Sequence, residues 1–487
     1  MKTKILLSLF LVFSFLQVTL SANVFVKHIG ISKTQIDVKN PTVVGEITIS
    51  PSAPGKVIVH FDGKCISTPG DRIILAASNT TSWGSNDGGV GIKAKTSEIN
   101  KNSFSHTRVY DVDSGTHTFY AIAQNYVDTD GDGIASIYGN MTVEFVPEGQ
   151  YIVGFTGISK THIFVKGPTI FGEVAISPST PGKVIVHFDG MCYSSVNDKI
   201  VLAASDTTTW RINDGSISVE ALNNDFRANP FSHTRVYDVD AGTHTFYAIV
   251  HNYVKTFGDG YASVYGSLTV EFVPEEEYIV GFAGISETRI DLIESKVVGE
   301  VTISPSTPGK AVVRFDGECI STAGDIITLA ASDTATWRPN DDNVSAEAFS
   351  KVINTNSFSH TRVYDVAAGT HKFYAIAQNY VKTDGNGVAS IYGSLTVKFF
   401  PESTTSLTTE INNGFSIYPN PANNFLNING LKDDANISVY SISGREVIQY
   451  KTNQQSPQLN ISSLENGIYL IKIVSDNRYH FMKFVKN

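Results

Sequence analysis

Phe104-Ser-His-Thr-Arg-Val-Tyr-Asp-Val112, followed by Gly115-Thr-His and Phe119-Tyr-Ala-Ile, decides the fold of this chain because it occurs three times. The later copies begin at Phe231 and Phe358. The one tryptophan and the one cysteine of each copy keep the same spacing: Trp83, Trp210 and Trp337, and Cys65, Cys192 and Cys319. The chain therefore contains one module in three tandem copies.

The composition favours a globular protein rich in strands. Of the 487 residues, 41% are apolar and 11% aromatic, and 39 glycines accompany many threonines, valines and tyrosines. The formal net charge is -10, with no Lys/Arg clusters. Such an acidic surface argues against binding to nucleic acids or anionic membranes.

Short alternating apolar runs separated by turn residues indicate seven or eight strands per module and no helix. We therefore expect an all-β fold of three tandem antiparallel β-sandwich modules, followed by a small C-terminal β-sandwich. In the first module the expected strands include residues 43–49, 56–61, 73–77, 106–112, 117–126 and 135–146.

The corner from Val112 through Gly115 to Tyr120 resembles the corner that enters a late strand of immunoglobulin or fibronectin type III sandwiches. A jelly roll would give nearly the same strand count, with its first and last strands also adjacent. We favour the immunoglobulin-like topology and keep the jelly roll as the alternative.

The repeat and the changes in composition divide the chain into six segments. Between modules, Pro147-Glu-Gly-Gln150 and Pro274-Glu-Glu-Glu277 are short, which predicts a stiff rod of modules. The expected segments are a signal peptide (1–22), repeats 1 to 3 (23–150, 151–277 and 278–402), a linker (403–412) and a C-terminal domain (413–487).

The N-terminus reads as a secretory signal peptide. Lys2 and Lys4 give it a basic start, an apolar run from Ile5 follows, and Ser21 and Ala22 are small residues suited to cleavage. That apolar run is too short to cross a bilayer comfortably. We expect no transmembrane segment in the mature chain.

Each module has one cysteine, in Phe-Asp-Gly-x-Cys, so no module can close its own disulfide. If the strand from Val57 continues without a bulge, Cys65 shares the inward parity of Val57, Val59 and Phe61. We expect a small buried apolar side chain there, with a reactive thiol or an intermodule bridge as the alternatives.

Beyond Phe415 the repeat has ended and four ordered motifs follow. They are Tyr-Pro-Asn-Pro with its flanking residues, Ile437 to Val447, Leu464 to Ile473, and Phe481 to Lys486. Together they resemble the type A C-terminal sorting domain of type IX secretion cargo. The resemblance implies a Bacteroidetes bacterium, the type IX machinery as a partner and delivery to the outer surface. The sorting-motif residues are Tyr418, Pro419, Asn420, Pro421, Gly467, Tyr469, Lys483 and Lys486.

The best candidate ligand site is a Trp-x-x-Asn-Asp segment after the strand that ends near Ser78. An exposed indole offers an apolar face to a sugar ring, and Asn and Asp supply hydrogen bonds to hydroxyls. The alternatives are a core tryptophan and a simple Asx turn. The candidate residues are Trp83, Asn86 and Asp87, Trp210, Asn213 and Asp214, and Trp337, Asn340 and Asp341. Residues 88–102 and their counterparts differ most between the copies.

His106, Arg108 and Tyr110 share one strand face, and with His60 and Asp62 they could form an acid-base or metal constellation. The third module has Arg314 in place of His60, and arginine neither ligates metals nor acts as a base near neutral pH. Cross-strand polar ladders explain the pattern equally well. We therefore predict no catalytic residues and no enzyme activity.

Asp128, Asp130 and Asp132 alternate like the start of an oxygen-ligand calcium loop. The twelfth position is Gly139 rather than glutamate, and the other modules lose ligands, which favours a Gly-rich hairpin turn. No cofactor is expected, with calcium left open at the first repeat alone.

These observations predict an exported or cell-surface bacterial protein with three repeated binding modules. Its expected function is adhesion or the binding of carbohydrate, including glycans or surface polysaccharide. Three linked copies of a weak site raise the avidity of the chain for such a ligand. The alternative is a structural spacer or coat protein without a specific ligand, and an enzyme is the third hypothesis.

Overall fold

The computed structural model describes residues 24–84, 88–93, 100–126, 131–149, 151–209, 215–220, 228–253, 258–275, 278–336, 343–347, 354–380, 385–402, 416–431, 434–441, 445–475 and 478–487. They belong to two compact units, Met1–Glu402 and Ser403–Asn487, each described below by itself. The signal peptide predicted over residues 1–22 lies outside the described residues.

Every module has eight strands in two four-stranded antiparallel sheets. In the first module one sheet has the order β1-β8-β3-β6 and the other the order β2-β7-β4-β5. The strands are β1 (Phe25–Asp37), β2 (Thr42–Ile49), β3 (Gly55–Ser67), β4 (Arg72–Ser78), β5 (Val90–Lys93), β6 (Asn100–Val112), β7 (His117–Asn125) and β8 (Ile134–Pro147).

The second and third modules repeat this arrangement strand by strand. The second has β9 (Ile152–Phe164), β10 (Thr169–Ile176), β11 (Gly182–Ser194), β12 (Lys199–Ser205), β13 (Ile217–Glu220), β14 (Ala228–Val239), β15 (His244–Asn252) and β16 (Tyr261–Pro274). The third has β17 (Val280–Asp291), β18 (Lys296–Ile303), β19 (Gly309–Ser321), β20 (Ile326–Ser332), β21 (Val344–Glu347), β22 (Asn354–Val366), β23 (His371–Asn379) and β24 (Val388–Pro401).

The strand order is that of a jelly roll, with the first strand beside the last. The all-β class and the antiparallel sandwich modules are confirmed, whereas the immunoglobulin-like topology is corrected to the jelly roll that stood as its alternative. The corner motif did not decide the topology, because a tight turn at Gly115 only shows that the chain passes from β6 in one sheet to β7 in the other. The expected number of seven or eight strands per module agrees with the eight described, although the ranges named for the first module did not include β1 or β5.

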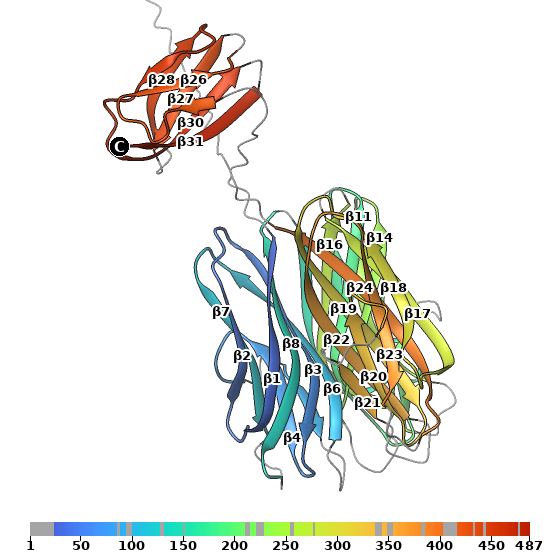
Figure 1. The fold of residues 1–487 in the computed structure, drawn as a ribbon. Coiled ribbons are helices and arrows are strands. Elements are labelled where there is room, and N and C mark those ends of the chain that lie inside the picture. Colours follow the sequence, from blue (N-terminus) through green and yellow to red (C-terminus); the bar gives the residue numbers. More distant parts are fainter. Residues whose placement is uncertain are drawn as a thin grey trace, which may run out of the picture. The chain divides into compact units, whose positions relative to one another are not determined.

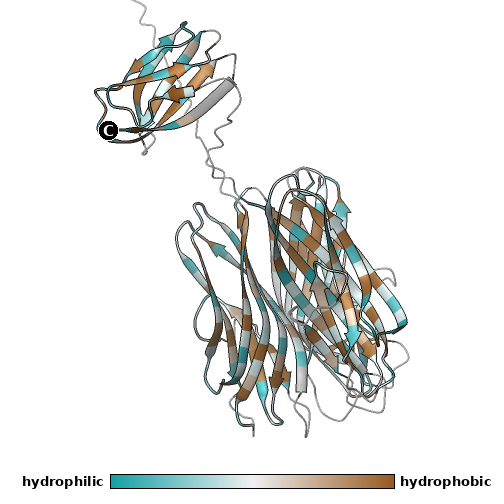
Figure 2. Ribbon diagram, viewed as in Figure 1, coloured by the Kyte–Doolittle hydropathy of each residue, from teal (hydrophilic) through white to brown (hydrophobic). Residues whose placement is uncertain are grey.

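Strand β3 is buried on both of its faces, and this positions the modules. Val57, Val59 and Phe61 point into the core of their own jelly roll. The alternate residues Ile58 and His60 are also buried, although they point out of that core. In Figure 2 apolar residues alternate with polar ones along many strands of the sandwiches. A strand covered on both faces must lie between two layers of protein.

The glycine of the Phe-Asp-Gly motif allows β3 and β8 to approach closely. Gly63 pairs with Gly139, and a Cβ atom at Gly63 would stand 2.1 Å from the carbonyl oxygen of Tyr138. Cys65 follows on the core side, as predicted. All three cysteines are free and buried, and burial raises the pKa of the Cys65 thiol to about 12, so that thiol stays protonated.

The first jelly roll lies beside the other two in Figure 1, and the cyclic contacts among the three modules define a pseudo-threefold axis. Strands β6, β14 and β22 contact one another at this axis, and β6 contacts β11, β14 contacts β19, and β22 contacts β3. The third module therefore returns to the first and closes a ring. The rod expected from the short linkers is wrong, because each linker joins neighbouring strand ends of adjacent modules.

Apolar residues from all three modules fill one part of the axial interface. Equivalent positions on the first strand of each module supply Val26, Val153 and Val280. Burial of such side chains contributes about 1.5–3 kcal/mol each, which makes this cluster a core shared by the ring.

A buried ion-pair layer crosses the same axis at three equivalent positions. Lys398 Nζ lies 3.0 Å from Glu144 Oε2 and also bonds Glu271 Oε1. Burial raises the pKa of Glu271; it would lower that of Lys398, but the two carboxylates outweigh it and the pKa of Lys398 is raised. Three glutamates here would repel one another, so the lysine of the third module balances the layer.

The C-terminal unit is a separate small β-sandwich, as expected. One sheet has the order β25-β26-β29 and the other β28-β27-β30-β31, around a core that includes Leu426, Ile437 and Phe484. Its strands are β25 (Ser416–Tyr418), β26 (Phe425–Asn429), β27 (Ala435–Ser441), β28 (Glu446–Thr452), β29 (Gln458–Asn460), β30 (Gly467–Ser475) and β31 (Arg478–Lys486). No helix long and apolar enough to cross a membrane occurs in the described part of the chain.

Replacing Lys398 with alanine should destabilise the three-module unit by about 3–5 kcal/mol, because it removes the cation that bonds both Glu144 and Glu271. Urea unfolding of the whole chain would measure this loss. The matched control is Lys372→Ala, which removes an exposed pair with Glu300 and should cost less than about 1 kcal/mol. Equal losses in the two variants would contradict the assigned role of the axial layer.

Candidate functional site: a polar ring between the modules

Strand β3 and its equivalents present a polar pair toward the axis, two residues apart on one face. The first module supplies His60 and Asp62, the second His187 and Asp189, and the third Arg314 and Asp316. The two histidines and the three aspartates are buried.

Each aspartate accepts hydrogen bonds from the preceding module of the ring. Asp189 Oδ2 accepts from Ser105 Oγ at 3.0 Å and from Thr107 Oγ1 at 2.7 Å. Asp316 Oδ2 accepts in the same way from Ser232 and Thr234, at 2.9 and 2.6 Å. Asp62 completes the cycle with Ser359 and Thr361 of the third module, at 3.0 and 2.9 Å.

The basic residues of the polar pairs connect to the same threonines. His60 Nδ1 lies 2.8 Å from Thr107 Oγ1, and His187 Nδ1 lies 2.7 Å from Thr234 Oγ1. Arg314 Nε donates to Thr361 Oγ1 at 3.4 Å. We call this closed set of nine residues the axial ring; its members are His60, Asp62, Thr107, His187, Asp189, Thr234, Arg314, Asp316 and Thr361.

The electrostatics of the axial ring are dominated by burial and by neighbouring charges. Burial and Arg314 lower the pKa of His60. Burial would raise the pKa of Asp62 and Asp189, but His60 lowers it for Asp62 and His187 lowers it for Asp189. The lowered pKa of Asp62 and of Asp189 favours the carboxylate form, which suits these two side chains to accept several hydroxyl donors.

A cavity of about 50 Å³ lies between the axial ring and the Lys398 layer. It is large enough for a few water molecules. Its polar lining includes Thr107, His187, Thr234, Arg314 and Lys398.

The sheet separates the residues of the proposed acid-base constellation. His60 pairs with Thr107, whereas His106 pairs with Phe61 and therefore lies on the core side of the strand. His106 Nδ1 accepts from Ala77 N at 2.9 Å, and Tyr110 donates to Ala77 O at 3.3 Å. These two side chains hold the sheets of one jelly roll together, and they do not converge with His60 and Asp62.

Trp83 is half-buried, at the start of the connection from β4 to β5. Its Nε1 atom is buried and has no hydrogen-bond partner among the described residues, and it lies beside Gly89. The connection leads into β5, where Gly91 N lies 3.2 Å from Met191 Sδ of the second module. The other residues predicted for these sites lie outside the described residues: Asn86, Asp87, Trp210, Asn213, Asp214, Trp337, Asn340 and Asp341.

Of the predicted calcium residues, Asp132 is described, whereas Asp128 and Asp130 lie outside the described residues. Asp132 Oδ1 accepts from Thr68 at 2.8 Å and from Ile134 N at 2.9 Å, and the bond from Ile134 lowers its pKa most. The buried Asp71 carboxylate accepts from Gly133 N at 3.0 Å. These hydrogen bonds stabilise a turn, and calcium binding at this turn stays a prediction.

The sorting motifs converge within the C-terminal unit. Asn420 Nδ2 donates to Lys483 O at 3.0 Å, and Val485 N donates to Asn420 Oδ1 at 2.9 Å. Tyr469 stacks on Phe484, with ring centroids 5.6 Å apart. The Tyr-Pro-Asn-Pro turn is thus fixed to the last strand, which explains why these separated motifs occur together.

Residues 416–487 match the family described as the secretion system C-terminal sorting domain. The type IX sorting domain that the motifs indicated is confirmed. This domain implies export through type IX secretion, recognition by its machinery, and a place at the cell surface or outside the cell. No curated protein is significantly similar to the chain.

Among solved structures, the chain is similar to PorZ, an essential bacterial surface component of the type-IX secretion system of Porphyromonas gingivalis. The two chains are 16% identical, the match covers 21% of this chain and 14% of that chain, and the TM-score is 0.14. Ruminococcus gnavus β-glucuronidase has 11% identity, coverages of 38% and 33%, and a TM-score of 0.13. A chain of Sulfolobus Turreted Icosahedral Virus has 11% identity, coverages of 77% and 91%, and a TM-score of 0.19. The chain thus spans well under half of the first two.

Acidification should destabilise the three-module unit through His106, His233 and His360. Burial lowers the pKa of each to about 4, so between about pH 6.5 and pH 4 the unfolded chain binds protons that the folded chain does not. The stability contribution is complete above pH 6.5 and is lost as the pH falls. At pH 5 the loss should be about 2 kcal/mol per histidine, measured by urea unfolding.

The variant His360→Gln tests this assignment, because glutamine can still accept from Ala331 N but does not titrate. Its stability should fall by about a third less than that of the wild type between pH 7 and pH 5. His162→Gln, at an exposed position, is the control. A pH dependence that is the same in both variants would refute the role of His360.

Proposed function

We propose that the three-module unit is an exported binding head for adhesion or for carbohydrate at the cell surface. The observation that carries this proposal is the ring itself, which places the equivalent strand pairs β4 and β5, β12 and β13, and β20 and β21 on one compact body. Three weak sites on one rigid body can engage a repetitive ligand together, and this raises avidity without a tight single site.

The interfaces between modules favour ligand sites to which two modules contribute side chains. Arg72, at the start of β4, bonds Tyr193 Oη of the next module, and β5 packs on the second module near Met191. At the equivalent interface between the second and third modules, the Glu318 carboxylate accepts a hydrogen bond from Ser218 Oγ at 2.7 Å. A ligand beside Trp83 would therefore meet side chains of two modules.

The side-by-side packing also bears on the alternatives. A spacer gains reach from modules placed end to end, whereas here the third module contacts the first. His60 and Asp62 are buried in structural hydrogen bonds, and His106 points away from them. We therefore place the spacer second and propose that the head is not an enzyme.

A glycan array probed with the whole chain tests the proposal. We expect binding by the wild type and its loss in the Trp83→Ala/Trp210→Ala/Trp337→Ala variant, because the apolar platform for the sugar ring is removed. The matching phenylalanine variant keeps an aromatic face and should retain part of the signal. Equal signals from the wild type and the alanine variant would exclude these tryptophans, and no signal from the wild type would exclude the glycan ligands tested.

A further inference from the structure

The hydrogen bonds of the axial ring determine which nitrogen of each histidine carries the proton. The Thr107 hydroxyl has one proton and gives it to Asp189, because a carboxylate can only accept. Thr107 must therefore accept from His60 Nδ1. By the same reasoning Thr234 donates to Asp316 and accepts from His187 Nδ1. In the neutral form of each ring, Nε2 is left as a bare lone pair.

These bare nitrogens face negative groups rather than donors. His187 Nε2 lies 3.2 Å from Asp189 Oδ2, and His60 Nε2 lies 3.6 Å from Asp62 Oδ2. Neither Nε2 atom has a hydrogen-bond partner among the described residues, and neither does Asp62 Oδ1. The two Nε2 atoms and the carboxylates of Asp62 and Asp189 are therefore buried acceptors close together, and a cation between them would stabilise them.

The third module shows how such a cation can be supplied within the chain. Arg314 stands where the other modules have His60 and His187, and its guanidinium is a permanent cation. Only the first two modules present an imidazole at this position. The unbalanced acceptors therefore lie where the first module meets the second.

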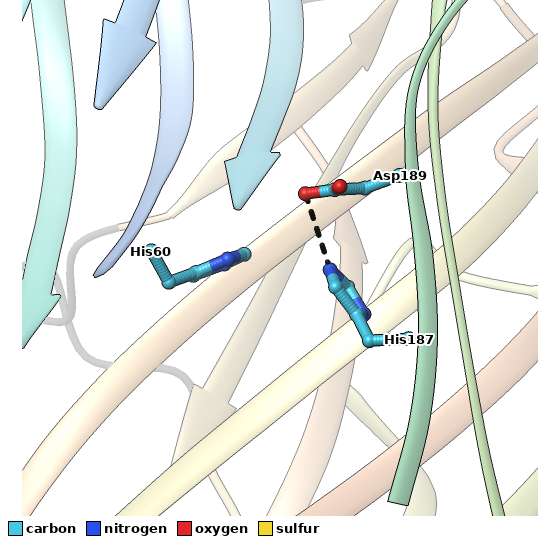
Figure 3. Close-up of side chains that lie close together, drawn as sticks. All are labelled: His60, His187 and Asp189. Atoms are coloured by element: carbon cyan, nitrogen blue, oxygen red, sulfur yellow. Dashed lines mark ion pairs between the residues drawn. The ribbon is translucent and has the colours of Figure 1, made fainter. Parts of the chain in front are cut away.

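We propose that His60, His187 and Asp189 bind one divalent transition-metal ion, with zinc as the best match. One ligand atom from each residue lies within 4.8 Å of the other two, and all three residues are buried (Figure 3). Two imidazoles and a carboxylate form a ligand set suited to zinc. Tetrahedral zinc places its ligand atoms roughly 3.3 Å apart, so binding would draw these side chains together.

The surroundings of the three residues are suited to metal binding. Thr107 and Thr234 orient the histidines through Nδ1, as the outer groups of metal sites commonly do. Ser267 Oγ holds Asp189 Oδ1 at 2.9 Å. The axial cavity, which His187 also lines, has room for a water molecule as the fourth ligand.

The metal would cross-link the first two modules and stabilise their interface. This role does not depend on the proposed ligand-binding function. The sequence argument against a repeated metal site fails here, because the ligands come from two modules and Arg314 is not one of them. The site would exist once per chain rather than three times.

Zinc titration of the whole chain, made without a histidine tag and stripped with a chelator, tests the proposal. We expect one zinc per chain by elemental analysis, calorimetric binding at micromolar or lower concentration, and a rise in Tm when zinc is restored. Failure of the stripped wild-type chain to bind zinc and to change its Tm would overturn the site, whatever the variants do.

The matched variant is His187→Arg, which copies the third module. It should fold, bind no zinc and keep a Tm that a chelator does not change. His60→Gln should also lose the metal, whereas His117→Ala, which lies at a surface corner, should keep it. Retention of stoichiometric zinc by a folded His187→Arg or His60→Gln chain would assign the ion to another place and refute this one.

Discussion

The structure depends on one repeated interaction, a buried aspartate that accepts two hydroxyl hydrogen bonds from the neighbouring module. Asp189 and Asp316 join modules that follow each other in sequence, but Asp62 joins the first module to the third. A buried carboxylate without donors would cost several kcal/mol, so each aspartate makes its interface nearly obligatory. The contact of Asp62 and the Lys398–Glu144 ion pair both join the third module to the first and so close the string of jelly rolls into a ring.

The closed ring accounts for the differences between otherwise similar modules. At a threefold axis every residue meets two copies of itself, so identical charges repel strongly in a buried place. The third module differs from the other two at two of these positions. It has Lys398 where they have Glu144 and Glu271, and Arg314 where they have His60 and His187. Three separate copies of any one module could not supply this combination, so the order of modules in the chain matters.

Much of the fold followed from the sequence because the patterns that decide it are local. Period-two alternation predicted the strands around Val57 and His117, and the parity of Cys65 predicted its burial. The choice between sandwich topologies depended on non-local pairing, such as β1 with β8, which local patterns do not encode. The inter-module interface was missed, although one signal pointed to it: Arg314 stands where the other modules have histidine, and Lys398 stands where they have glutamate.

The candidate sites were predictable to different extents for the same reason. The sorting motifs sit in a domain of their own, and their sequence alone identified them. His60, Asp62 and His106 were grouped by strand period, but a strand has two faces and an offset of one pairing position puts His106 into the core. The metal ligands span two modules, so no inspection of a single repeat could assemble them. Fusion of the three jelly rolls in one chain is what allows such a site, because it lets equivalent positions carry different residues while the ring keeps them in contact.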